Sequence, residues 1–450
     1  MKRELVSQTL EIAPAAPTLK QAFWYWLKLG FISFGGPAGQ IAIMHKDLVE
    51  DKRWISEKRF LHALNYCMVL PGPEAQQLAT YIGWLMHKTR GGLLAGGLFV
   101  LPSLLILMAL SYIYMRFGGT PAVAGVLYGI KPAVVAIVLF AAVRIGSRAL
   151  KNKALWAIAA ASFMAITLIG LPFPLIILAA AAIGYLGNRF APNLFSDKNG
   201  HKASQKNQSK ILGKSVIDDD TPTPAHAHFG WRAFVKFLLI GLAIWLASMV
   251  TLTAVYGWQA VYTQMAWFFT KAALLTFGGA YAVLPYVYQG AVTHYSWLSP
   301  TQMMDGLALG ETTPGPLIMV VAFVGFIGGW QHAATYSPLI SAVIAACIVT
   351  LFTFLPSFIF IFMGAPFIES TKNNLKLNGP LTAITAAVVG VIVALALFFA
   401  LHVFWPNRAI DWLALLAAAL GFVALFKFKV NTIHLIGVFA LLGLLRAWLV

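Results

Sequence analysis

The chain alternates long apolar stretches with short polar loops, and two of the apolar stretches are interrupted. Residues 22–44 contain a Phe-Gly-Gly-Pro break at 34–37, and residues 60–86 contain a Pro-Gly-Pro break at 71–73. Proline lacks a backbone N–H and clashes with the carbonyl four residues earlier, and glycine adds backbone freedom. Neither stretch is therefore expected to form one continuous helix. In hydrocarbon a broken backbone is tolerated only where it is buried in protein or lines a wet cavity.

The same pattern returns in the second half of the chain. A second Phe-Gly-Gly begins at Phe277, 243 residues after Phe34, and a second Pro-Gly-Pro at 314–316 follows the first at the same offset. The Leu-Pro-Ser sequence at 101–103 recurs at 355–357, at an offset of 254. A constant spacing held over about forty residues indicates an internal duplication.

The remaining apolar stretches predict membrane helices. They lie at roughly 93–115, 123–145, 154–170 and 174–187, and at 232–255, 338–363, 380–401, 409–426 and 431–449. A membrane span needs about 20 residues, so 154–187 predicts either a tight helical pair or one bent element. Residues 188–229 are polar and predict a disordered or loosely ordered linker. The predicted organisation is an N-terminal tail (1–21), a first repeat (22–187), the linker (188–229) and a second repeat (230–450).

Loop charges predict the orientation of the repeats. Loop 45–59 carries five Lys or Arg residues, whereas its counterpart, 288–305, carries none. Lys88 and Arg90 likewise have a counterpart loop, 330–337, without a cation. By the positive-inside rule the first loops, the N-terminus and the linker are cytoplasmic, and the two repeats are inverted. Because basic loops flank 60–86 on both sides, we predict re-entrant hairpins with their tips at the breaks; broken spanning helices are the alternative.

Composition agrees with an all-α polytopic membrane protein in a lipid bilayer. The 450 residues are 60% hydrophobic and 10% charged, whereas a soluble domain has about 25% charged residues. The net charge of +17 is attributed to cytoplasmic loops and not to nucleic-acid binding. Cys67 and Cys347 lie in apolar stretches, so neither a disulfide nor a metal cluster is expected. His201, His226 and His228 are expected to be solvated, and no cofactor is expected.

The breaks have the chemistry of an anion site. After Pro73 the first backbone N–H groups of the new helix have no intrahelical partner, and the helix dipole adds about half a positive charge there. The paired glycines would let backbone approach a ligand closely, although packing of small residues is the alternative. The candidate substrate-binding residues are Lys28, Gly35, Gly36, Pro71, Gly72, Pro73, Gln76 and Gln77 in the first repeat, and Lys271, Gly278, Gly279, Thr313, Pro314, Gly315 and Pro316 in the second.

The polar candidates have alternative interpretations. A lysine at mid-membrane costs about 2.5–3.5 kcal/mol, and snorkelling would lower that cost. The symmetric recurrence of Lys28 as Lys271 favours attraction of a substrate. Gln76, Gln77 and Thr313 could hold the oxygens of an oxyanion or satisfy backbone groups freed by the breaks.

Two carboxylates are proton-coupling candidates. Glu74 and Glu311 are interpreted as the only acidic residues within the broken stretches, and they are not equivalent, because Glu74 aligns with Leu317 and Glu311 with Met68. Glu74 begins a half-helix, where negative charge is favoured, whereas Glu311 ends one, where it is disfavoured. Glu311 is therefore the better candidate for a proton acceptor beside an anion.

Long motifs around both sets of breaks resemble the chromate ion transporter family in its two-domain form. They are FGGPAGQIAIMHKDLVEDKRWIS, NYCMVLPGPEAQQLATYIGW, GGLLAGGLFVLPS, TFGGAYAVLPYV and ETTPGPLIMVVAFVGF. The resemblance implies an inner-membrane protein that exports chromate, driven by the membrane potential or the proton gradient, and confers chromate resistance. Some relatives carry His where Gln40 stands, and many carry Asn where Glu74 stands.

Other functions remain open at this level. Sulfate is also a tetrahedral dianion, so import of sulfate or another inorganic anion is the main alternative. A membrane-embedded enzyme would need a nucleophile–base pair or a metal cluster, and the histidines at 45, 62, 87, 294 and 434 have no such spacing. We therefore expect no enzymatic activity. The sequence leaves a homodimer, the transport direction and the coupling ion undecided.

Overall fold

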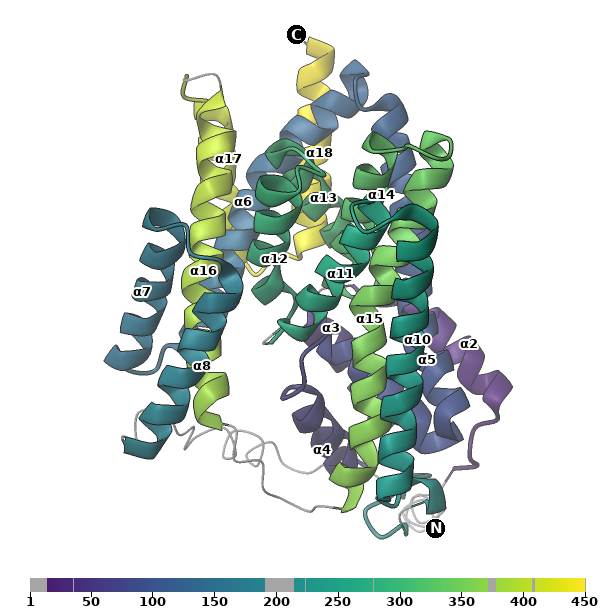
Figure 1. Ribbon diagram of the computed structural model, residues 1–450. Helices are drawn as coiled ribbons and strands as arrows, with labels where there is room; N and C mark the ends of the chain where they lie inside the picture. Colours follow the sequence, from purple (N-terminus) through teal and green to yellow (C-terminus); the bar gives the residue numbers. More distant parts are fainter. Residues whose placement is uncertain are drawn as a thin grey trace, which may run out of the picture.

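The computed structural model describes residues 14–34, 36–190, 214–222, 224–277, 279–370, 378–406 and 409–449 (Figure 1). The described residues form an all-α fold, and seven of its helices are long and apolar enough to cross a membrane. The predicted fold class, an all-α polytopic membrane protein, is thereby confirmed. The seven helices are α5 (Glu74–Phe117), α6 (Pro121–Ala149), α8 (Phe173–Phe190), α10 (Trp231–Tyr256), α15 (Pro338–Ser370), α16 (Asn378–Phe404) and α18 (Thr432–Leu449).

Shorter helices surround the breaks in the same order in each half. The first half has α2 (Leu19–Ile32), α3 (Gly36–His45), the π-turn η1 (Lys46–Asp51) and α4 (Glu57–Cys67) before α5. The second half has α11 (Val261–Leu274), α12 (Ala280–Tyr288), the π-turn η3 (Gln289–His294), α13 (Pro300–Thr312), η4 (Leu317–Met319) and α14 (Val320–Gln331) before α15. Each break in the sequence is thus a break between helices.

Equivalent residues also begin equivalent helices. The hydroxyl of Ser56 caps α4 by accepting the N–H of Arg59, and the hydroxyl of Ser299 caps α13 by accepting the N–H of Gln302. The halves differ at the next turn. In the first, two helical segments of α5 join at a kink at His87 and Lys88, whereas a loop separates α14 from α15 in the second.

The first half folds back on itself at both breaks. His87, at the kink of α5, donates a hydrogen bond of 2.8 Å to the carbonyl of Pro17, just before α2. The start of α2 and the kink therefore lie at one end of the molecule. Gly72, at the opposite end of the first segment of α5, contacts the second half. This path has the shape of the predicted hairpins; their re-entrant placement in a membrane stays a prediction.

Helix α10 opens the second half and carries the chain to the other end of the molecule before the broken helices of that half begin. At its start Phe229 packs against Phe367, near the end of α15, with ring centroids 5.5 Å apart. At its end the hydroxyl of Tyr256 lies 3.3 Å from that of Tyr336, just before α15. The two helices are therefore antiparallel along their length. The broken helices of the second half start from the end opposite to those of the first, and Figure 1 shows α4 low and α13 high in the molecule.

The outer helices pack reciprocally. Helices α7 (Lys153–Leu168) and α8 pack on α16, whereas α17 (Trp412–Phe426) and α18 pack on α6 (Figure 1). Residues 154–187 thus form two separate helices and not one bent element, and the two pack mainly on α16 and little on each other. Each half covers a long helix of the other, so neither half can complete its packing alone.

Part of the linker is docked and not loosely ordered, which corrects the prediction for residues 214–222 and 224–229. Ile217 donates its N–H to the carbonyl of Trp54, and its own carbonyl accepts the N–H of Ser56. The hydroxyl of Ser56 also donates to the carboxylate of Asp219 at 2.6 Å. These contacts satisfy exposed backbone groups of the loop before α4 and bury Ile217. His201 lies outside the described residues.

Two glycines of α18 provide a test of the packing on α6. A methyl group added at Gly443 would lie 2.8 Å from the Cα of Gly129, whereas one added at Gly437 meets nothing within 4 Å. We expect Gly443→Ala to lower the free energy of unfolding by about 1–3 kcal/mol, because it overpacks a close helix contact. Gly437→Ala is the matched control and should leave the thermal unfolding temperature in detergent unchanged or raise it. Equal effects of the two substitutions would contradict this packing.

Candidate anion site at the paired helix breaks

Each Pro-Gly-Pro break is bound to the Phe-Gly-Gly break of the other half. The N–H of Gly72 donates to the carbonyl of Thr276 at 2.7 Å, and the N–H of Gly315 donates to the carbonyl of Ser33 at 2.8 Å. Both the donors and the acceptors are 243 residues apart in the sequence. This reciprocity is the signature of a two-fold relation, here between two halves of one chain.

The glycines of the Pro-Gly-Pro breaks are required by conformation and by space. Gly72 has φ of 131° and Gly315 has φ of 107°, a region that side chains rarely adopt. A Cβ at Gly72 would also collide with the hydroxyl of Ser357, and one at Gly315 would lie 2.7 Å from the Cβ of Ser103. The two Leu-Pro-Ser motifs thus recur because each places a serine against the break of the other half.

The glycines of the Phe-Gly-Gly breaks start new helices. Gly36 begins α3 with φ of 70°, and Gly279 precedes α12 with φ of 98°. Gly35 and Gly278 lie outside the described residues. No side chain caps α12, so its first N–H groups remain free of side-chain partners.

A small cavity of about 10 Å³ lies where three helix starts meet. It is lined by Pro37 and Gln40 of α3, by Pro73, Glu74 and Ala75 at the start of α5, and by Pro316 and Leu317 at η4. No side chain caps α5 or η4, so their first N–H groups have no capping side-chain partner, and the dipole of α5 places partial positive charge beside the Glu74 carboxyl. The cavity has room for about one water molecule, which is less than a tetrahedral oxyanion needs.

Gln40 joins the breaks and was not among the predicted site residues. Its side chain is buried, and its amide nitrogen donates to the carbonyl of Gly315 at 2.5 Å and to that of Ser33 at 3.2 Å. One signal in the sequence could have identified it. Gln40 is a polar residue one helical turn after a break, on a stretch that is otherwise apolar.

The other neutral polar candidates satisfy groups near the breaks. The amide of Gln77 donates to the backbone carbonyl of Pro71 at 2.8 Å. The hydroxyl of Thr313 donates to the backbone carbonyl of Leu309 at 2.6 Å. Gln76 donates to the hydroxyl of Thr80 at 3.0 Å. The amide oxygens of Gln40, Gln76 and Gln77 are nonetheless buried without a partner. Such unpaired polar atoms are rare in sealed cores, so this region retains hydrogen-bonding capacity.

The two predicted proton-coupling carboxylates occupy different positions. Glu74 lines the central cavity at the first turn of α5. Glu311 lies in the last turn of α13 and accepts a hydrogen bond from the hydroxyl of Tyr281, in the first turn of α12. Position 38, the equivalent of Tyr281 in the first half, is an alanine. The tyrosine–carboxylate pair therefore exists at only one of these two equivalent places.

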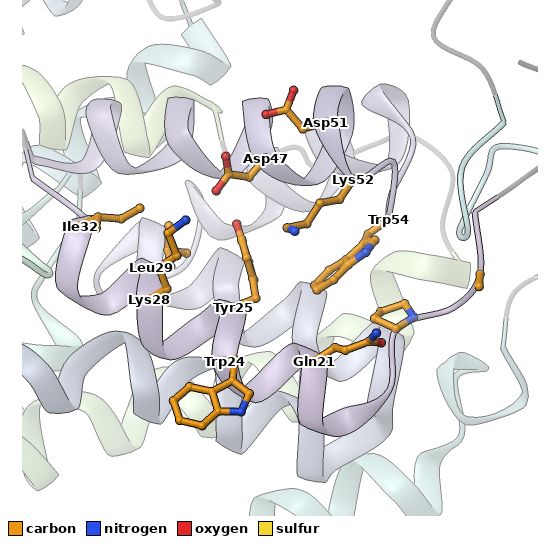
Figure 2. Close-up of a pocket in the computed structure, with 12 residues that line it drawn as sticks. Gln21, Trp24, Tyr25, Lys28, Leu29, Ile32, Asp47, Asp51, Lys52 and Trp54 are labelled. Carbon is orange, nitrogen blue, oxygen red and sulfur yellow. The ribbon is translucent and has the colours of Figure 1, made fainter. Parts of the chain in front are cut away.

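The structure does not bring Lys28 and Lys271 to the central cavity. Lys28 lies in a separate cleft of about 670 Å³ between α2 and η1, together with Tyr25, Asp47 and Lys52 (Figure 2). Asp51 also lines this cleft, so two carboxylates oppose the binding of an anion there. Lys271 lies at the last turn of α11, with its ammonium group 5.4 Å from the ring centroid of Trp267.

The interpretation that Glu74 and Glu311 are the only acidic residues of the broken stretches is wrong. Because α13 begins at Pro300, Asp305 is inside this helix and not in a loop. It is 2% exposed, and it accepts a hydrogen bond of 3.0 Å from the hydroxyl of Tyr114 on α5. The Ser299–Gln302 capping box is a sequence signal that marks the earlier helix start.

Among the described residues there is no group of three His, Cys, Asp or Glu side chains that could hold a metal ion. Cys67 and Cys347 are free thiols, the first buried and the second exposed. The chemistry around the breaks is therefore that of backbone N–H groups, helix dipoles, amides and carboxylates.

Comparison with known proteins identifies the family. The profile of the family described as "Chromate transporter" matches residues 20–185 and 263–444. A chromate transport protein of Pseudomonas aeruginosa is 33% identical over 449 residues, which cover 98% of this chain and 95% of the relative. One of Cupriavidus metallidurans is 31% identical over 418 residues, covering 92% and 89%. No solved structure matches the chain. Because these matches extend over both halves, the protein is a multi-pass membrane protein that belongs to the chromate transporter family.

Proposed function

We propose that this protein is a secondary active transporter that exports chromate from the cytoplasm and thereby confers chromate resistance. The observation that carries the proposal is the convergence of uncapped helix starts from both halves on one central cavity. Free N–H groups at helix starts bind oxyanions without a cation, and weak, reversible binding suits a transported substrate. The names of the relatives from Pseudomonas aeruginosa and Cupriavidus metallidurans support chromate as the anion.

Transport requires the central site to open. The cavity of about 10 Å³ is too small for chromate, so this conformation is closed around the site. The two tips are held by one reciprocal pair of hydrogen bonds, through Gly72 and Gly315. Rocking one half against the other would break equivalent contacts on alternate sides, as in transporters built from inverted repeats. Lys28 and Lys271 lie away from the central cavity in this closed conformation, in the cleft between α2 and η1 and at the last turn of α11.

Proton coupling is assigned first to Glu311. Its carboxylate lies beside the tips, and Tyr281 supplies a hydroxyl that stabilises its charged form. A dianion close to this carboxylate is repelled until the carboxylate takes up a proton, so the anion and the proton bind together. The pair keeps a net negative charge, and a cytoplasm-negative membrane potential would therefore drive its export. Glu74 lines the cavity itself and is the second candidate.

Sulfate transport is the alternative function. The same helix starts would bind any tetrahedral dianion, because they recognise charge and oxygen atoms and not the central atom. Two measurements therefore distinguish import of sulfate from export of chromate. They are the direction of the anion flux and the degree to which one anion inhibits transport of the other.

Everted membrane vesicles test the proposed function directly. We expect energised everted vesicles that contain the protein to accumulate chromate, because their interior corresponds to the outside of the cell. An uncoupler should abolish the accumulation, and the extent to which excess sulfate lowers it measures the competition between the two anions for the site. Vesicles without the protein are the control. Sulfate accumulation in right-side-out vesicles would favour the alternative, and absence of any oxyanion flux would exclude both functions.

Glu311→Gln tests the coupling group. The amide mimics a protonated carboxyl, so chromate exchange across proteoliposomes should persist while its dependence on pH and on a proton gradient is lost. Glu74→Gln, measured in parallel, shows whether the coupling is shared between the two carboxylates. Glu50→Gln, at an exposed position of η1, is the control and should behave like the wild type. Unchanged pH dependence in Glu311→Gln would refute the assignment.

The inverted orientation is tested with a matched pair of labelling sites. Lys58 and Thr301 are both exposed and are 243 residues apart, in the loop-side first turns of α4 and α13. With Cys67 and Cys347 replaced, we expect a membrane-impermeant maleimide to label Thr301→Cys in intact cells and Lys58→Cys only after permeabilisation. This pattern would place the N-terminus and the linker in the cytoplasm. Labelling of both sites from one side is incompatible with inverted repeats.

A further inference from the structure

We propose that Asp305 is a second protonation site of the transporter, between the outer end of α13 and the central breaks. The inference deepens the proposed function, since it rests on proton-coupled anion transport. Asp305 lies near the middle of α13 (Pro300–Thr312) and precedes Glu311 by six residues, or about 9 Å along the helix axis. One helix thus carries two carboxylates, Asp305 on the way to the tip and Glu311 at the tip itself.

The surroundings of Asp305 suit a group that binds and releases a proton. Its side chain is 2% exposed, and one carboxylate oxygen accepts a hydrogen bond from the hydroxyl of Tyr114. The other oxygen is buried without a hydrogen-bond partner. A fully charged carboxylate is poorly served by a single donor, and adding a proton removes most of the cost of burying the charge.

The charges that act on Asp305 come from two neighbouring helices. Helix α5 contributes Tyr114, and α6 contributes the positive charge of Lys131. Among the described residues, Tyr114 and Lys131 are the titratable groups that interact with this carboxylate, and α14, α16, α18 and η4 also pack against α13. Lys131 moderates the cost of the charged form but forms no ion pair with Asp305 within 4.0 Å in the described structure. Asp305 is therefore not held permanently charged by a direct partner.

The pseudo-symmetry supplies a second, independent observation. The residue 243 positions before Asp305 is His62 on α4, and its ring nitrogen lies 3.2 Å from the carbonyl of Ile368. Tyr114 is the hydrogen-bond partner of Asp305, and Ile368 lies 254 positions after Tyr114, which is the offset of the Leu-Pro-Ser motifs. Ile368 is therefore the residue of the second half that corresponds to Tyr114. Both halves thus place a titratable side chain at the same point of the hairpin, in contact with the long helix of the other half. Helix packing alone does not require titratable residues at both places.

Proteoliposomes with the full-length protein test the proposal. We expect Asp305→Asn to retain chromate exchange without a gradient and to lose accumulation driven by a pH gradient, with Asp305→Glu restoring it. Tyr114→Phe removes the donor that favours the charged form, so the pH profile of driven uptake should move to more alkaline values. Asp411→Asn is the matched control, because Asp411 also accepts a tyrosine hydrogen bond, from Tyr128 at 2.7 Å, and asparagine caps α17 equally well.

The outcomes separate this inference from the proposed function. If the wild type shows no proton-driven flux, the proposed coupling fails. If a pH gradient drives chromate accumulation equally well in the wild type and in Asp305→Asn, only the present inference is overturned. Asp305→Asn could also lose chromate exchange. In that case a second measurement decides: the number of protons that the purified protein takes up or releases when chromate is added, at a pH where chromate is fully dianionic. If this proton number for Asp305→Asn differs from the numbers for the wild type and Asp411→Asn, the proposal is supported. If the three numbers are equal, the proposal is overturned.

Discussion

The structure depends on one reciprocal pair of backbone hydrogen bonds, Gly72 to Thr276 and Gly315 to Ser33. A helix broken inside an apolar environment leaves N–H and C=O groups that must find partners, because lipid offers none. Each half supplies the partner for the break of the other. The Pro-Gly-Pro and Phe-Gly-Gly motifs are therefore complementary parts of one junction, and neither half could bury its breaks alone.

The same reciprocity extends outward from the junction. The serines of the two Leu-Pro-Ser motifs pack against the glycines of the opposite breaks, and the outer helix pairs α7–α8 and α17–α18 cover α16 and α6 of the other half. Helix α10 makes this arrangement possible, because it carries the chain to the opposite end before the broken helices of the second half begin. One additional helix between the two copies reverses the direction of the second copy, so that each Pro-Gly-Pro break meets the Phe-Gly-Gly break of the other half.

The chemistry is less symmetric than the scaffold. The junction itself obeys the two-fold relation, whereas Glu74 lines the cavity from one half and the Glu311–Tyr281 pair exists only in the other. At the mid-hairpin position the two halves carry different titratable residues, His62 and Asp305. The scaffold is therefore duplicated, whereas the titratable groups placed on it differ between the two halves.

The sequence alone determined the helical class, the internal repeat, the positions of the breaks and the family resemblance, because proline, glycine and apolar runs act locally and a constant offset needs no coordinates. It did not indicate that Lys28 lines an outer cleft, that Gln40 lines the central cavity or that Asp305 is buried inside α13. Whether a side chain points to the cavity or to an outer cleft depends on which helices pack around it. Only the tertiary structure decided those neighbours, because the two backbone hydrogen bonds that pair the breaks join residues more than two hundred positions apart.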